Sequence, residues 1–71
     1  MLINRSDISV LQKLSDAKEL VPIELIPQSF KTDFNKFFFG KTLVKDEANH
    51  LFAYPSDVKR WVRMLFLTYK D

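Results

Sequence analysis

Aromatic side chains supply much of the apolar content of this chain, which has no cysteine. Its 71 residues include seven Phe, two Tyr and one Trp. A chain of this length has room for one core only, and such small domains need disulfides, metals, self-association or dense apolar packing to stay folded. The absence of cysteine excludes disulfides and thiolate zinc sites. We therefore expect one domain over residues 1–71, stabilised mainly by aromatic packing.

Four phenylalanines form the clearest helical pattern. Their spacing of i, i+4, i+7 and i+8 places them on one face of a helix; they are Phe30, Phe34, Phe37 and Phe38. Pro27 suits the first position of this helix, and Gly40 can take the positive φ that often follows a helix end. Two alternatives stay open for Phe39. It is exposed if the helix continues, and it turns inward if the helix ends at Phe38.

Two more helices are indicated. One is expected over residues 7–18, with Ser6 as its N-cap. The other is expected to open at Asp57, with Ser56 as its N-cap. Its apolar face consists of Val58, Trp61, Val62, Leu65 and Tyr69. We expect Trp61 to be buried against the phenylalanines at positions 30, 34 and 37.

The remaining segments predict extended structure. Residues 20–27 form an apolar connector between two prolines, which disfavour helix in the residues before them. We expect it to bury Val21, Ile23 and Ile26. Strand-forming residues at 42–44 and 50–54 then flank a polar loop, in which Asn49 can take left-handed φ; this pattern is typical of a β-hairpin. The predicted fold class is α+β: two N-terminal helices, a β-hairpin and a C-terminal helix around an aromatic core.

No motif for catalysis or metal binding is complete. Gly40, Lys41 and Thr42 match the end of a phosphate-binding P-loop, but Asn35 stands where its first glycine belongs. The single histidine, His50, has no cysteine to pair with, and the acidic residues beside it lack calcium-loop spacing. We therefore expect no enzyme activity, no cofactor, no metal and no small-molecule substrate.

Basic residues concentrate in the second half of the chain. Residues 31–71 hold eight basic side chains against five acidic ones. One face of the last predicted helix carries Lys59, Arg60, Arg63 and Lys70, with Leu67 among them. Such a face can contact successive phosphates of a nucleic acid, or it can serve only to keep a small apolar protein solvated. The solvated face is the interpretation we favour.

The second half of the chain resembles a known family. The run FFFGK at residues 37–41, the strand LFAY at 51–54 and DVKRWV at 57–62 resemble excisionase and MerR-like winged helix-turn-helix proteins. In that family a recognition helix precedes a Gly-Lys step, a β-hairpin wing and a helix that contains Trp. The resemblance implies DNA binding, with Lys31 and Lys36 on the recognition helix and Lys45 on the wing.

Two classes of function remain open. The first is a protein-interaction or adaptor module, including self-association as a homodimer, that presents Phe39, Leu67 or the apolar connector to a partner. The alternative is a small DNA-binding accessory protein. The N-terminus has no apolar signal region and no apolar run approaches the length of a membrane helix, so the expected location is the cytoplasm.

Overall fold

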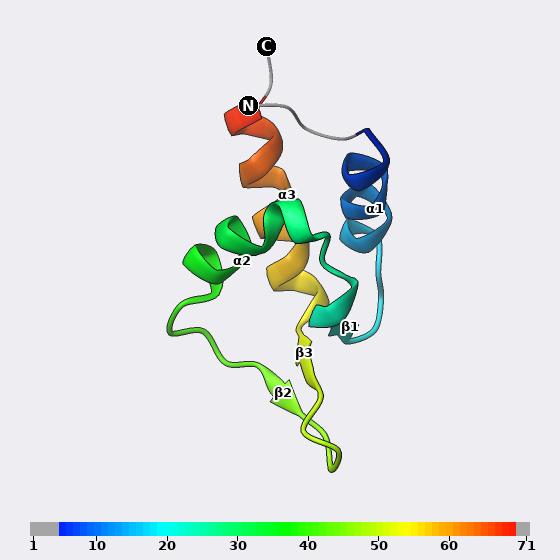
Figure 1. Ribbon diagram of the computed structural model, residues 1–71, viewed down its shortest axis with the longest axis vertical. Helices are drawn as coiled ribbons and strands as arrows, with labels where there is room; N and C mark the ends of the chain where they lie inside the picture. Colours follow the sequence, from blue (N-terminus) through cyan, green and yellow to red (C-terminus); the bar gives the residue numbers. More distant parts are fainter. Residues whose placement is uncertain (1–4, 70–71) are drawn as a thin grey trace.

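Three α-helices and a small antiparallel sheet make up the fold, which is α+β as the sequence predicts (Figure 1). The computed structural model describes residues 5–69, with side chains up to residue 66. The elements in chain order are α1 (Arg5–Ser15), β1 (Val21–Pro22), the 3-10 turns η1 (Ile23–Leu25) and η2 (Gln28–Phe30), α2 (Lys31–Phe38), β2 (Val44–Lys45), β3 (Leu51–Ala53) and α3 (Pro55–Tyr69).

The sheet has one strand more than the predicted hairpin. Its order is β1-β3-β2, so β3 lies in the middle and pairs antiparallel with both neighbours. Val21 pairs with Ala53, which makes part of the apolar connector an edge strand. Pro22 cannot donate to a ladder, and an edge position tolerates this. The connector buries Val21 and Ile26 as expected, whereas Ile23 is only half-buried.

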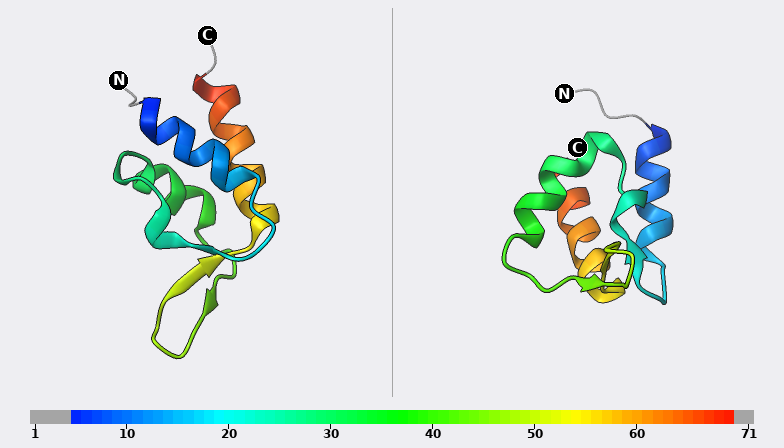
Figure 2. Two further views of the ribbon diagram at one scale, coloured as in Figure 1. Left: turned by 90° about the vertical axis from the view of Figure 1, so that its right-hand side faces the viewer. Right: turned by 60° about the horizontal axis from the view of Figure 1, so that its bottom comes forward.

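Helix α3 packs along α1 on one side and meets α2 through its aromatic residues on another (Figure 2). Its buried side chains join those of the other helices and the sheet in one cluster. Trp61 is only 1% exposed, with its ring centroid 5.3 Å from that of Phe34 and 6.2 Å from that of Phe38. The predicted burial of Trp61 and its contact with Phe34 are thus confirmed, while the contact with Phe38 was not predicted. Among the described residues, no helix combines the length and the apolar character that crossing a membrane requires.

The helix ends differ from the predicted ones. α1 begins at Arg5, so Ser6 lies inside it rather than at its cap. It ends at Ser15, whose hydroxyl donates to the carbonyl of Gln12 at 2.7 Å and competes with the helical hydrogen bonds. α3 begins at Pro55, which suits a first helical position because proline has no N–H to satisfy. The carbonyl of Tyr54 therefore accepts the first bond of α3, from Asp57 at 3.0 Å, and Ser56 is not the cap.

Candidate functional site

A tight turn at the end of α2 holds Phe39 away from the protein. The N–H of Lys41 donates to the carbonyl of Phe38 at 3.0 Å. Phe39 has φ −60° and ψ 122°, and Gly40 has φ 80°, which are the angles of a type II turn. The Phe39 side chain is 89% exposed. The structure combines parts of both alternatives. The helix ends at Phe38, but Phe39 does not turn inward and is exposed instead.

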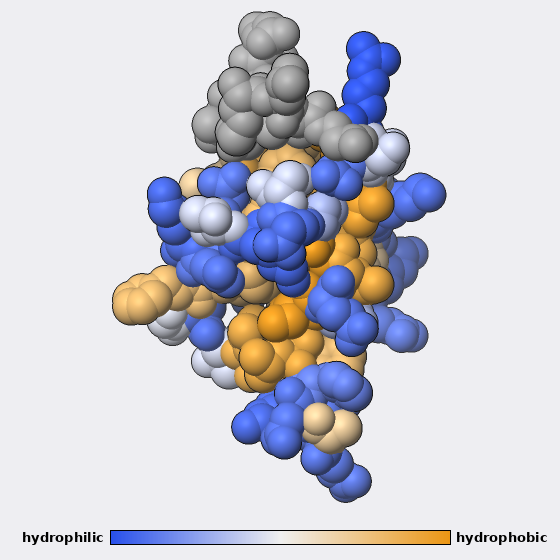
Figure 3. Space-filling model, viewed as in Figure 1, coloured by the Kyte–Doolittle hydropathy of each residue, from blue (hydrophilic) through white to orange (hydrophobic). Residues whose placement is uncertain are grey.

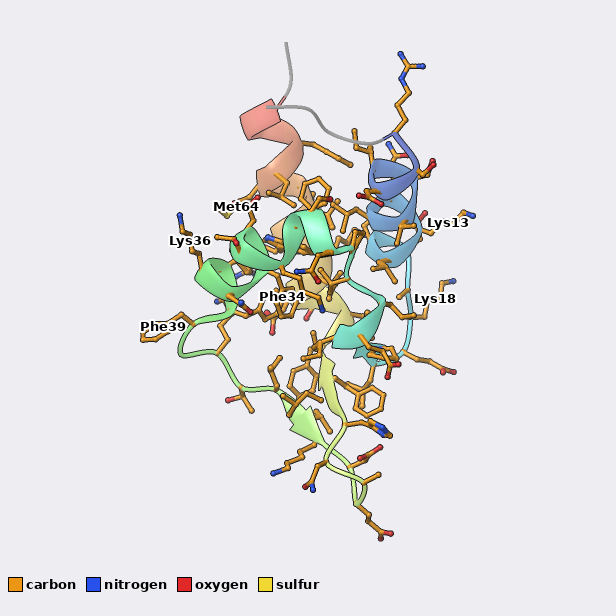
Figure 4. The ribbon with its side chains drawn as sticks, in the orientation of Figure 1. Lys13, Lys18, Phe34, Lys36, Phe39 and Met64 are labelled. Atoms are coloured by element: carbon orange, nitrogen blue, oxygen red, sulfur yellow. The ribbon has the colours of Figure 1, made fainter. Side chains whose placement is uncertain are left out.

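The outward face of α2 is polar and ends in this aromatic ring. Phe34 and Phe38 point into the core, so the residues opposite them face solvent. The exposed set that lines one shallow hollow of about 460 Å³ consists of Thr32, Asn35, Lys36 and Phe39. Figure 4 shows Lys36 and Phe39 projecting on the same side of the molecule, and Figure 3 shows a hydrophobic projection at the place where Figure 4 labels Phe39. None of the four carries a carboxylate. We call this set the α2 face.

Lysines dominate the charge around the α2 face. Residues 28–45 contain four lysines and one acidic residue, Asp33, which is half-buried. Lys36 lies on the α2 face itself, and Lys45 is exposed on β2. Lys31 is half-buried, and its ammonium donates to the carbonyl of Ile23 at 2.9 Å, which ties α2 to η1. Lys31 therefore has a structural role, in addition to any contact implied by the resemblance.

The 3-10 turn η2, which precedes α2, contacts α1. The hydroxyl of Ser29 donates to the carboxylate of Asp7 at 2.6 Å. This bond brings a negative charge to the η2 end of the helix and engages the hydroxyl. The α2 face therefore begins at Thr32, after this contact.

A second hollow lies between α2 and α3. It measures about 490 Å³ and is lined by Asp33, Lys36, Phe37, Lys41, Trp61, Met64 and Leu65. The ammonium of Lys41 lies 4.9 Å from the centre of the Phe37 ring, in the range of a cation–π contact. Among the described residues, the buried Nε1 of Trp61 finds no hydrogen-bond acceptor. A buried donor without an acceptor normally costs free energy, so among the described residues the indole is held by packing and not by a hydrogen bond.

At least one basic residue of α3 lies on a different surface from the α2 face. Lys59, Arg60 and Arg63 are exposed, as predicted. Lys59 lines a hollow at the end of α1 together with Asp16 and Lys18. The side of α3 that meets α2 is instead formed by Trp61. Lys59 and Lys36 therefore line different hollows. The side chain of Leu67 and all of Lys70 lie outside the described residues.

The hairpin loop is organised by one carboxylate. Oδ1 of Asp46 accepts the N–H groups of Ala48 at 2.9 Å and His50 at 2.8 Å, and Oδ2 lies 3.2 Å from Nδ1 of His50. The backbone bond from His50 is the main cause that lowers the pKa of Asp46, and the His50 ring adds to it. Asn49 takes φ 68°, as expected. Within the described residues, no three His, Cys, Asp or Glu side chains are grouped as metal ligands would be.

Sequence reasoning overlooked part of the α2 face. Thr32 and Asn35 were visible as the polar positions opposite the phenylalanine pattern but were not singled out, whereas Phe39 was a candidate whose exposure stayed open. Comparison with known proteins adds no further guide, because no family model, curated protein or solved structure matches this chain.

Proposed function

We propose that this protein binds duplex DNA and presents the α2 face to the major groove. The observation that carries the proposal is the chemistry of that face: a hydroxyl, an amide, an ammonium and an aromatic ring, with no carboxylate among them. Asn side chains pair with adenine, Lys with guanine or phosphate, and Thr with several bases. A helix about 10–12 Å across fits a groove about 12 Å wide.

The surroundings of α2 also support DNA as the partner. α2 is followed by a hairpin and then by α3, the order on which the resemblance to winged helix proteins rests. The hairpin extends beyond the end of α2 (Figure 1). Its first strand carries Lys45, whereas its tip carries Asp46 and Glu47, both exposed. Lys45 is therefore the part of the hairpin suited to a phosphate.

Fluorescence anisotropy with a random duplex of about 20 base pairs tests the proposal. A DNA-binding protein attracts any sequence through its phosphates, with a nonspecific Kd of about 1–100 μM. Contacts from Lys36, Lys41 and Lys45 give a slope of log affinity against log salt of about −2 to −3, so binding should weaken by about 15- to 60-fold between 50 and 200 mM salt.

The chain offers a matched control for the α2 face. Thr32→Ala/Asn35→Ala/Lys36→Ala removes a hydroxyl, an amide and one positive charge from exposed helical positions. Ser9→Ala/Gln12→Ala/Lys13→Ala removes the same groups at the same spacing from exposed positions of α1. Figure 4 shows Lys13 and Lys36 on opposite sides of the molecule.

We expect the α2 variant to bind about tenfold more weakly and the α1 variant to match the wild type within about twofold. Equal losses in the two variants would contradict the use of the α2 face. Absence of salt-sensitive binding by the wild type would contradict DNA binding itself.

A second candidate function is binding of another protein, including a second copy of this chain. Leu20 is 41% exposed and Leu25 is 50% exposed, and both line a largely apolar hollow beside the edge strand β1. Light scattering over a range of concentrations tests self-association. Leu20→Lys/Leu25→Lys should keep a self-associating protein monomeric. Both candidates are non-enzymatic, and we propose the cytoplasm as the location in either case.

A further inference from the structure

We propose that Phe39 selects thymine, by packing on its 5-methyl group at or beside an adenine–thymine pair whose adenine is read by Asn35. This inference rests on the proposed function and names the DNA feature that the α2 face recognises. Three observations carry it: the way Phe39 is held, its neighbours on the surface, and the charge around it.

The turn at the end of α2 prepares Phe39 for contact. Three other phenylalanines of this region, at positions 30, 34 and 38, are buried, while the Phe39 ring is 89% exposed. The type II turn sets the direction of the ring through the Phe38–Lys41 hydrogen bond of 3.0 Å and the positive φ of Gly40. Little backbone freedom is therefore lost when the ring meets a ligand, and burying it gains apolar contact.

Asn35 lies one helical turn before Phe39 and lines the same hollow. Side chains four positions apart on a helix are about 5–6 Å apart at Cβ. Successive base pairs are about 3.4 Å apart. The two side chains therefore reach the same base pair or neighbouring ones. An Asn amide pairs with N6 and N7 of adenine, and the thymine opposite that adenine presents its methyl group in the same groove.

The charge around Phe39 favours DNA over an apolar protein partner. Lys36 lines the hollow with Phe39, and Lys41 follows the turn. A dry protein contact over the ring would also cover polar Thr32, Asn35 and Lys36, which would each need a partner. The edge of a major groove supplies acceptors for all of them, and its phosphates complement the lysines.

Replacement of thymine by deoxyuridine tests the inference, because it removes the methyl group and leaves charge, pairing and duplex geometry in place. Wild-type protein is titrated in parallel with an A·T-rich duplex of about 20 base pairs and with its deoxyuridine counterpart. We expect about fourfold tighter binding to the thymine duplex for each methyl group contacted. Phe39→Ala should remove the difference, whereas Leu25→Ala, at another exposed apolar position, should preserve it.

The outcomes separate this inference from the proposed function. If wild-type protein binds both duplexes with the same salt-sensitive affinity, Phe39 does not read thymine, although DNA binding stands. If Phe39→Ala keeps the thymine preference, another residue makes that contact and the inference is wrong. If no duplex binds and light scattering reveals self-association that Phe39→Ala abolishes, the proposed function and the inference both fail, and Phe39 is a protein contact.

Discussion

The indole of Trp61 meets the ring of Phe34 edge to face, with centroids 5.3 Å apart and planes at 86°. Phe34 in turn stacks on Phe38 at 4.2 Å, so the three rings join α2 to α3. This contact fixes the position of the helix that carries the candidate site. The α2 face is outward because these rings are inward.

Replacement of Trp61 by alanine should remove a large part of the free energy of unfolding and sharply lower the melting temperature. Truncating a buried Trp costs about 3–5 kcal/mol. A domain of this size has a free energy of unfolding of about 4–10 kcal/mol. Met64→Ala is the control, because Met64 lies on the same helix and is more than half exposed. Thermal melts followed by circular dichroism make the comparison, and a cooperative melt of Trp61→Ala near that of the wild type would refute the role of this ring.

Replacement of Trp61 by phenylalanine should be far milder. The variant keeps an aromatic ring against Phe34 and removes the buried Nε1, which finds no acceptor among the described residues. Removing an unsatisfied donor recovers about 1–3 kcal/mol, which offsets much of the lost ring volume. We expect a net cost of about 1 kcal/mol or less in urea unfolding. A cost as large as that of Trp61→Ala would mean that Nε1 has a partner in solution.

The turn that holds Phe39 depends on Gly40. A methyl group added there would meet no atom within 4 Å, so the cost of Gly40→Ala comes only from the positive φ of 80°. We expect a loss of about 1–2 kcal/mol in the free energy of unfolding. Gly40→Asn should cost less because Asn tolerates this region. Equal stabilities of Gly40→Ala and wild type would show that the turn changes its form.

The pKa of the Asp46 carboxyl should lie below its ordinary value of 3.8. The backbone N–H of His50 stabilises the ionised form in the folded protein, and this lowers the pKa. The contribution to stability is therefore present above about pH 4 and disappears as the pH falls through the lowered pKa. A carboxyl NMR titration measures it directly, with Asp46→Asn as the variant whose stability lacks this dependence. An observed pKa at or above 3.8 would contradict the hydrogen bonds of the loop.

Several features were determined by neighbours in the sequence. The phenylalanine spacing predicted the burial of Phe34 and Phe38 on α2 and of Phe30 just before it, although Phe37 is only half-buried. Gly40 and Asn49 both take the positive φ expected of them. Such features follow from contacts within a few residues, because helix periodicity and turn angles depend on local geometry. The apolar face of α3, with Trp61 at its centre, belongs to the same group.

Other features were decided only by the tertiary structure. The connector became strand β1 because β3 offered it an edge, and that pairing joins residues about thirty positions apart. Lys31 was turned inward by a carbonyl of η1, and the packing of α3 against α1 placed Lys59 in a different hollow from Lys36. The direction of the Phe39 side chain depends on the packing of Phe30, Phe34 and Phe38 in the core, because that packing orients α2. The sequence alone therefore determined which residues face inward on each helix. The outward-facing residues come together in one surface only through contacts between segments that are distant in the sequence. Local sequence patterns do not encode such contacts.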